Sequence, residues 1–479
     1  MLSFAVFFPI AAGTLMFLLP DRRVLRCILT ELVTILTSVS VFYALVYLKG
    51  RSETVLPITG TLSLAFHLDG AGAVFAALSA FLWPLAVLYA FEYMRHEGGE
   101  RHFFPLYTIS FGVTLGVAFA GNLLTMYIFY ELLSLATLPL VIHGSKPESE
   151  RAGTTYMYYT FGGAALALIG TIPLLYFTGG SFLPGGILPP ELSGRPGLMQ
   201  FLFLCCALGF GVKAAIMPFH SWLPKAAVAP TPVTALLHAA AVVKAGAFAY
   251  IRISYFSFGA EVLRGTVAQL IMILLASITI VYGALCAVRE HHLKRRLAWS
   301  TVSNLSYIML SASLFTEAGL TGAFTHLLFH ALMKITLFFT AGAILVRTGK
   351  TEIEEMRGLS ASMPVTTTVY MIGAFALSGL PILPGFASKW MIGTAAISAG
   401  PLGFLGLAAL LTSAVLCGIY ALTPGFSMLF RSTGQESEHA DPGAAMTISL
   451  ICLTLAIFLA GLFSNTIIHL VAAAAAASM

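Results

Sequence analysis

Long apolar stretches alternate with short polar loops over the whole of the 479-residue chain. A helix needs about 20 apolar residues to cross the hydrocarbon core of a membrane, and the pattern predicts about fourteen such helices. Their expected ranges are 2–19, 27–48, 70–91, 104–120, 123–142, 155–178, 199–217, 232–256, 265–287, 296–315, 320–346, 364–398, 402–424 and 445–470. The predicted fold class is therefore an all-α polytopic membrane protein.

Two of the predicted helices are interrupted. The seventh ends at Pro218, with a helix able to resume near Trp222, and the twelfth contains Pro381, Pro384 and Gly385. Proline removes a backbone donor and breaks a helix. Unwound backbone at membrane depth is tolerated only where protein or a watery cavity satisfies it. We therefore expect helices seven and twelve to be broken at places that matter for function.

Composition agrees with a membrane protein. The chain is 58% hydrophobic and only 9% charged, whereas soluble domains carry about 25% charge. The net charge of +5 does not indicate nucleic-acid binding, because the basic residues lie in short loops. Linkers rich in Gly, Pro, Ser or charge are expected at 49–69, 179–198 and 431–444. No soluble domain is expected, so residues 1–479 are predicted to form a single integral membrane domain.

The basic residues divide unequally between the two sides of the membrane. Odd-numbered loops carry 16 Lys and Arg, and even-numbered loops with their adjoining helix ends carry 5. The positive-inside rule then predicts that both termini lie outside. Three carboxylates near span ends, Glu31, Glu92 and Asp69, are expected to be interfacial. The four remaining basic residues fall inside predicted spans, and they are Lys213, Lys244, Lys334 and Lys389.

Ionisable side chains at membrane depth cost roughly 2.5–3.5 kcal/mol each on insertion scales and usually mark ion pathways. Besides the four lysines, Glu131 lies near the middle of a span. One Glu–Lys pair can neutralise itself, while burial disfavours the charged form of the lysines that lack an anion. Such lysines can accept protons. Snorkelling to the interface is a poor explanation for Lys213, Lys244 and Lys334, because long apolar segments flank them.

Histidines lie close to two of these lysines, and histidine titrates nearest neutral pH. His326, His330 and Lys334 are spaced i, i+4, i+8 and share one helix face. His238 precedes Lys244 by six residues. We interpret His330 and His238 as candidates for a relay, and His326 as a hydrogen-bonded core residue.

The six cysteines all lie in apolar stretches without a C-x-x-C pair. They predict packed core residues rather than a disulfide framework or a metal site. No cofactor is expected either. Haem would need axial histidines that face each other across a bundle, whereas His326 and His330 share one face.

The two interrupted helices suggest an internal duplication, since a lysine lies beside each break. Glu131 and Lys213 are 82 residues apart, and Asn304 and Lys389 are 85 apart. Inverted-repeat transporters place their ion sites at such breaks. We predict two five-helix repeats, over residues 104–256 and 265–424.

Five segments resemble one family: GFGVKAAIMPFHSWLPKAAVAPTPVTALLHAAAVVKAGAFAYIR, YELLSL, KRRLAWSTVSNLSY, HLLFHALMKITLFF and GLPILPGFASKW. They closely resemble the antiporter-like subunits shared by respiratory complex I, Mrp-type cation/proton antiporters and membrane-bound hydrogenases. The resemblance implies fourteen helices, two inverted five-helix repeats with helices seven and twelve broken, and both termini outside. It also implies roles for residues of the first repeat. Glu131 matches the helix-five glutamate that pairs with the helix-seven lysine, here Lys213, and Lys244 matches the bridging lysine of helix eight.

In the second repeat the resemblance makes His330 and Lys334 the relay of helix eleven and Lys389 the terminal residue on helix twelve. One position departs from the pattern. Many relatives carry a histidine where this chain has Asn304. Asparagine cannot take up a proton, so the relay at this point depends on water, or is shifted or weakened.

Together these observations favour a proton-translocating, antiporter-like subunit in the plasma (inner) membrane of a prokaryote. The subunit itself would be non-catalytic. Its expected partners are the lipid bilayer, other membrane subunits including sister antiporter-like subunits, and a peripheral redox arm where the complex is redox-driven. Sodium wants several oxygen ligands, so the chain is assigned protons, and any sodium path is left to a partner.

Two other functions are compatible with a polytopic chain. The main alternative is a stand-alone solute carrier, which would need a substrate-sized polar cavity. The other is a haem- or quinone-reducing enzyme. The parent complex could be of the complex I, Mrp antiporter or hydrogenase type, and the sequence does not choose among them.

Overall fold

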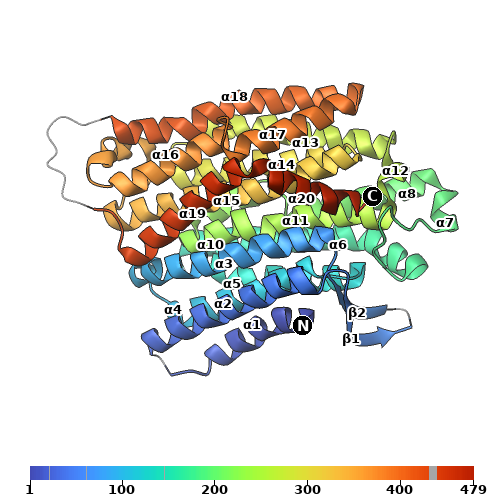
Figure 1. Cartoon of the computed structure of the whole chain (residues 1–479), viewed down its shortest axis with the longest axis horizontal. Helices are drawn as coiled ribbons and strands as arrows, with labels where there is room; N and C mark the ends of the chain where they lie inside the picture. The colour runs from blue at the N-terminus through green and yellow to red at the C-terminus, as the bar shows by residue number, and fades with distance from the viewer. Residues whose placement is uncertain (21, 61, 145, 431–439) are drawn as a thin grey trace.

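The computed structural model describes residues 1–20, 22–60, 62–144, 146–430 and 440–479. Its helices run side by side along one axis as a single bundle (Figure 1). By length and hydropathy, nine of the described helices can each cross a membrane, and four further apolar helices are shorter. The predicted all-α membrane fold class is confirmed, and the chain is a multi-pass membrane protein. The count of fourteen crossings stays a prediction.

Most helices overlap the predicted ranges, whereas the last predicted span, 445–470, is divided between two helices, and two strands were not predicted. The first part of the chain forms α1 (Leu2–Met16), α2 (Arg23–Tyr47), β1 (Ser52–Thr59), β2 (Leu62–His67), α3 (Gly70–Glu97), α4 (Glu100–Ala118), α5 (Leu123–Val141), α6 (Pro147–Thr178), α7 (Pro190–Ser193) and α8 (Pro196–Gly211). The middle forms α9 (Trp222–Lys225), η1 (Ala226–Val228), α10 (Thr231–Ala235), η2 (Leu236–Ala240), α11 (Val242–Arg252), η3 (Ile253–Phe258), α12 (Ala260–Leu263), α13 (Val267–Arg289) and α14 (Leu293–Ala312). The last part forms α15 (Glu317–Thr348), η4 (Ile353–Met356), η5 (Leu359–Ala361), α16 (Pro364–Ser378), α17 (Pro384–Ser398), α18 (Pro401–Leu429), α19 (Ala444–Leu462) and α20 (Ser464–Ala476).

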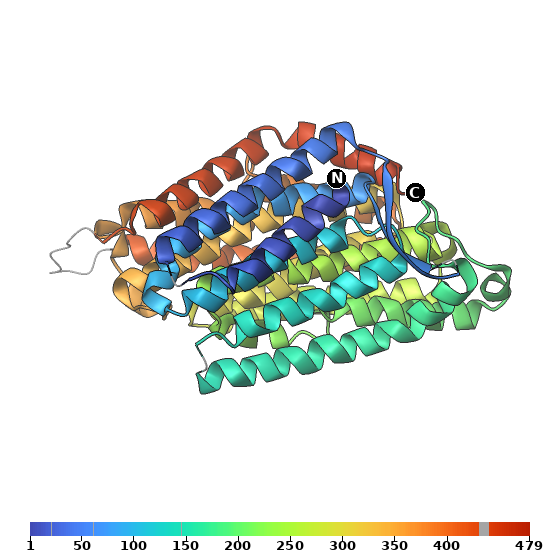
Figure 2. The same cartoon turned by 90° about the horizontal axis from the view of Figure 1, so that it is seen from below.

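The predicted linkers have different outcomes. Most of 49–69 folds as an antiparallel hairpin of β1 and β2, in which Ser52 pairs with His67. The hairpin lies at the end of the bundle where residues 1 and 479 are found (Figures 1 and 2). Most of the linker 431–444 lies outside the described residues. The hairpin adds a small β element to the predicted all-α architecture.

The centre of the bundle is formed by two spans. Residues Thr231–Phe258, which join α10, η2, α11 and η3, are buried along all of their most apolar window, and α15 is buried along 83% of its window. By contrast, α18 is buried along 33% of its window, and α6 follows one edge of the bundle (Figure 2). Most side chains on α11 and α15 are therefore shielded from lipid, and a buried ionisable group there needs partners within the protein or a buried water.

The seventh predicted helix ends earlier than expected. It was predicted to run to residue 217, but α8 ends at Gly211 and leaves Lys213 in unwound chain. The freed backbone groups are satisfied by distant side chains: the indole Nε1 of Trp222 donates to the Val212 carbonyl at 2.8 Å, and the Met217 amide donates to Thr279 Oγ1 at 3.0 Å. These tertiary hydrogen bonds replace helical ones, which is why Pro218 alone did not indicate the position of the break.

The break in the twelfth predicted helix lies where the prolines indicate it. α16 ends at Ser378, Gly379 takes the left-handed conformation at φ +93°, and α17 begins at Pro384. Gly385 follows in the first turn of α17, and a Cβ at this position would overlap the carbonyl oxygen of Ala376 in α16. The two half-helices therefore touch backbone to backbone at Gly385.

Gly385→Ala is expected to lower the free energy of unfolding by about 1–3 kcal/mol, because the added methyl group forces α16 and α17 apart. Unfolding of the purified chain in mixed micelles measures the loss. Gly393→Ala is a matched control on the same helix, since its Cβ would lie 3.6 Å from the nearest atom. Equal stability of the two variants would show that the close crossing at Gly385 is unimportant.

Candidate functional site

Glu131 and Lys213 come together as the sequence predicts. Glu131 projects from α5, and the Nζ of Lys213 lies 3.9 Å from its Oε1. The same Nζ donates a hydrogen bond to the Tyr130 carbonyl and lies 3.3 Å from the centroid of the Tyr130 ring. Lys213 is fully buried, whereas the Glu131 side chain is 21% exposed. At 3.9 Å the ion pair is looser than a hydrogen bond, and a small movement of either side chain would open or close it.

The unwound segment that carries Lys213 packs directly on α11. A Cβ at Gly246 would lie 2.6 Å from the Ala214 amide nitrogen and 2.8 Å from the Lys213 Cβ. Only glycine allows so close an approach of two backbones. Because Gly246 is two residues after Lys244 in α11, this contact places the break of the seventh helix beside the helix that carries Lys244.

A line of polar side chains, joined by two hydrogen bonds and one stacked pair of rings, runs from Lys244 to α17. The Nζ of Lys244 lies 2.6 Å from Nδ1 of His330 on α15, and both residues are fully buried. The rings of His330 and His326 are stacked with centroids 5.5 Å apart. Nδ1 of His326 lies 3.0 Å from the Oγ of Ser388, which precedes Lys389. Three helices that are distant in sequence thus contribute to one polar path through the apolar core.

Lys389 closes the break of the twelfth helix. Its Nζ donates to the carbonyls of Leu377 at 2.7 Å and Ser378 at 3.0 Å. These carbonyls belong to the last turn of α16, where the helix dipole favours a cation. Lys389 is therefore bound to backbone oxygens, and among the described residues no carboxylate pairs with it.

Lys334 points away from the line that contains His330. It lies one turn further along α15, and its Nζ donates to the Leu297 carbonyl at 2.9 Å and to Ser300 Oγ on α14. Asn304 continues this side branch, since its Nδ2 donates to the Ser300 carbonyl at 2.8 Å and to the Tyr420 hydroxyl at 3.3 Å. The predicted neighbours His330 and Lys334 share a helix face but bind different partners.

His238 is buried in the π-helical turn η2, and its ring lies 4.7 Å from that of Phe338. Neither of its ring nitrogens has a hydrogen-bond partner among the described residues, Lys244 included. The predicted pairing of His238 with Lys244 is therefore not a direct contact in this structure.

Two residues of the site, Ser388 and Ser300, give little signal in the sequence. His326 is predicted to be a hydrogen-bonded core residue, and it is fully buried with Nδ1 hydrogen-bonded to Ser388, while its ring also stacks on that of His330. Ser388 and Ser300 were not singled out, because serines in membrane helices commonly bond to their own backbone and give little signal. Their only sequence cues are that Ser388 adjoins Lys389 and that Ser300 lies one turn before Asn304.

A second buried ion pair was also missed. Arg252 is one of the five basic residues assigned to the even-numbered loops and helix ends, and Asp69 is expected to be interfacial, but Arg252 is fully buried at the end of α11. The guanidinium binds both carboxylate oxygens of Asp69, with Nη2 to Oδ1 at 2.8 Å. Phe182, Phe248 and Phe256 surround it, with ring centroids 4.6–5.3 Å from Cζ. Asp69 also caps α3 by accepting a hydrogen bond from the Gly72 amide.

The family described as NADH:quinone oxidoreductase/Mrp antiporter, transmembrane region, matches residues 120–417. The chain belongs to this family. The matched range contains Glu131, the two broken helices and the polar line between them. The resemblance inferred from the five sequence segments is thereby confirmed.

Individual relatives cover more of the chain. It is 32% identical to a Na(+)/H(+) antiporter subunit of Alkalihalophilus pseudofirmus over 477 residues, which cover 91% of this chain and 58% of that protein. It is 30% identical to a NADH-quinone oxidoreductase subunit of Desulforudis audaxviator over 411 residues, covering 82% and 80% of the two chains. The fold matches a chain of respiratory complex I from Thermus thermophilus with a TM-score of 0.84 and 27% identity, over the whole of both chains. The chain thus spans little more than half the length of the Na(+)/H(+) antiporter protein that it matches.

Proposed function

We propose that the chain is a proton-translocating, antiporter-like subunit of a multisubunit membrane complex. The observation that carries this proposal is the buried line Lys244, His330, His326 and Ser388, which joins groups that can exchange protons across three helices. Such groups are rare at membrane depth and mark ion pathways. The loose pair of Glu131 and Lys213 lies at the other break.

The pair of Glu131 and Lys213 would act as an electrostatic switch. At an effective dielectric of ~20, two charges 4 Å apart interact by about 4 kcal/mol. Closing the pair favours the charged form of Lys213, and opening it withdraws that stabilisation, which corresponds to a change of about 10³ in proton affinity at 1.36 kcal/mol per factor of ten. Lys213 would then pass its proton towards Lys244 on the helix that it packs against.

In the second half, the geometry favours a route that bypasses Asn304. His330 and His326 lead towards Ser388 and Lys389, whereas Lys334 leads to Asn304 and Tyr420. We therefore include His326 in the relay, with Lys334 as a side branch that biases it by charge. Nε2 of each of these two histidines and Oδ1 of Asn304 are buried without a partner among the described residues. Buried polar atoms of this kind are normally satisfied by water, so the steps between side chains would be completed by water.

The names of the relatives support the proposal that the chain works within a multisubunit complex. One belongs to a Na(+)/H(+) antiporter and the other to a quinone oxidoreductase, so the proposed partners are other membrane subunits, sister antiporter-like subunits among them, together with a redox arm in a redox-driven complex. We place the chain in a prokaryotic plasma membrane with both termini outside, following the 16-to-5 bias of basic residues. We also propose that residues 104–256 and 265–424 form two inverted five-helix repeats. Any sodium path is assigned to a partner protein.

His330→Ala tests the relay directly. In the complex that contains this chain, reconstituted into proteoliposomes, we expect proton translocation to fall at least tenfold, because Lys244 loses the side chain to which it is hydrogen-bonded. A pH-sensitive dye inside the vesicles measures the rate. His469→Ala is the control, since His469 is exposed on α20. A wild-type rate in His330→Ala would exclude this relay.

A second comparison separates the two routes. If protons pass through His326, then His326→Ala slows translocation, while Asn304→Ala leaves the rate within about twofold of wild type. The opposite result would place the path on the branch through Lys334 and Asn304.

A further inference from the structure

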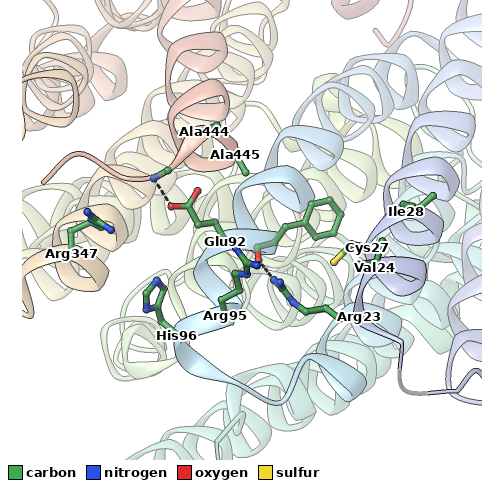
Figure 3. Close-up of a pocket in the computed structure, with 12 residues that line it drawn as sticks. Arg23, Val24, Cys27, Ile28, Glu92, Arg95, His96, Arg347, Ala444 and Ala445 are labelled. Atoms are coloured by element: carbon green, nitrogen blue, oxygen red, sulfur yellow. Dashed lines mark hydrogen bonds between the residues drawn. The ribbon is translucent and has the colours of Figure 1, made fainter.

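A basic cavity lies at the end of the bundle opposite the β-hairpin, where α2 and α19 begin and α3 and α15 end. Its volume is about 590 Å³. Three arginines, Arg23, Arg95 and Arg347, share it with an apolar wall that includes Val24 and Ile28 (Figure 3). The cavity is remote from the relay, and nothing in the proposed proton path uses it.

The cavity carries more positive charge than its own carboxylates neutralise. Glu92 is turned towards α19, where it accepts hydrogen bonds from the amides of Gly443 and Met446 and so caps that helix (Figure 3). Arg23 is paired with Glu100, with its Nε 2.8 Å from both oxygens. Among the described residues, the other two arginines have no carboxylate partner.

Arg95 and Arg347 are the two arginines free to bind a ligand. Among the described residues, Arg95 has no hydrogen-bond or ion-pair partner, and Arg347 donates only from Nε, to the Ala440 carbonyl at 3.1 Å. Both side chains are exposed. Arginine presents a planar fork of donors that matches a phosphate group. Within the described part of the chain, the cavity therefore holds two guanidinium groups that no carboxylate neutralises.

An apolar stripe continues from the cavity into the membrane region. Val24, Ile28 and Leu32 are 72%, 57% and 50% exposed on α2 and follow one face of the helix at four-residue intervals. α19 presents a similar row that includes Ile448 and Leu455. Both helices pack on α3, so the stripe and the row flank the same helix below the arginines.

We propose that this cavity binds one anionic phospholipid, with the phosphate on Arg95 and Arg347 and an acyl chain along Val24, Ile28 and Leu32. Basic pockets between membrane helices on the cytoplasmic side bind anionic lipid headgroups, and the arginines belong to the loops that the charge bias assigns to that side. A free phosphate ion has no apolar part that could pack on the apolar stripe. An acidic segment of a partner protein would not need a stripe that extends down the lipid-facing side of α2.

The double variant Arg95→Gln/Arg347→Gln tests the site in the purified complex that contains the full chain. Native mass spectrometry counts retained phosphatidylglycerol, and titration of delipidated complex gives its affinity. With about 1 kcal/mol per arginine near the membrane surface, and tenfold per 1.4 kcal/mol, we expect binding to weaken about 30-fold and one lipid to be lost. Phosphatidylcholine and inorganic phosphate should not replace it.

The matched control is Arg289→Gln/Arg357→Gln, which removes two exposed arginines from the same predicted side outside the cavity. It should keep the lipid, and both double variants should unfold at the wild-type temperature. Arg95→Gln alone should give a partial loss. Undiminished phosphatidylglycerol in the Arg95→Gln/Arg347→Gln variant would overturn the proposal. So would full competition by inorganic phosphate, or loss of a neighbouring protein of the complex with the lipid retained.

Discussion

Glu131→Gln and Lys213→Ala are each expected to abolish proton translocation while leaving the complex assembled. Glu131→Gln keeps the shape of the side chain but removes the charge 3.9 Å from the Lys213 Nζ. Lys213→Ala removes the proposed proton carrier at the break of the seventh helix. Both changes disable the proposed switch, so we expect the rate to fall to the leak rate of protein-free vesicles. Proton uptake in proteoliposomes measures the rate, and copurification of the neighbouring subunits measures assembly.

Two exposed residues supply matched controls for these variants. Glu148→Gln and Lys225→Ala make the same chemical changes outside the membrane core, and we expect near-normal rates from both. Normal pumping in Glu131→Gln and in Lys213→Ala would refute the relay model. Loss of assembly in either variant would instead assign that residue a structural role.

Arg252→Ala is expected to destabilise the chain by about 3–5 kcal/mol, the cost of breaking a buried ion pair by removing one partner. The guanidinium is fully buried among three phenylalanine rings and holds Asp69, which also caps α3. Without it, the Asp69 carboxylate loses its counter-ion, and α3 loses one of its links to α11. Unfolding of the purified chain in mixed micelles gives the change in free energy.

Arg295→Ala is the control for this experiment. Its guanidinium pairs with Glu290 at 3.1 Å but is half exposed, and such surface pairs contribute about 0–1 kcal/mol. Arg252→Lys should restore part of the loss, because lysine keeps the charge but not the two-pronged contact. If Arg252→Ala were no more destabilising than Arg295→Ala, the buried pair would not hold α3 to α11.

How far the sequence predicts the site differs from residue to residue. The break at the twelfth helix was predicted because Pro381 and Pro384 act on the backbone next to them. The break at the seventh was misplaced, because α8 ends at Gly211 and the unwound chain after it donates a hydrogen bond to Thr279 and accepts one from Trp222. Those partners are close only after the bundle has formed, so no local pattern indicates them.

The histidines also show that a local pattern does not reveal partners that are distant in sequence. Spacing along α15 placed His326 and His330 on one face, and this follows from helix geometry alone. Spacing could not show that His330 meets Lys244, 86 residues earlier, or that His326 meets Ser388, 62 residues later. His326 is the buried, hydrogen-bonded residue that its sequence predicts, and its neighbours are the reason that we also propose it for the relay.

The amino-acid sequence was enough to predict a multi-pass membrane protein of the NADH:quinone oxidoreductase/Mrp antiporter family, with four lysines and one glutamate inside the predicted spans. Hydropathy, proline positions and family motifs are properties of contiguous residues, so they can be read without a fold. The tertiary structure decided which buried groups meet. Arg252 and Asp69 are 183 residues apart, and Lys334 binds Ser300 rather than joining its helix neighbour His330. In an apolar core a polar group needs a partner within the protein or a buried water, and only the packing of the helices determines which partner is within reach.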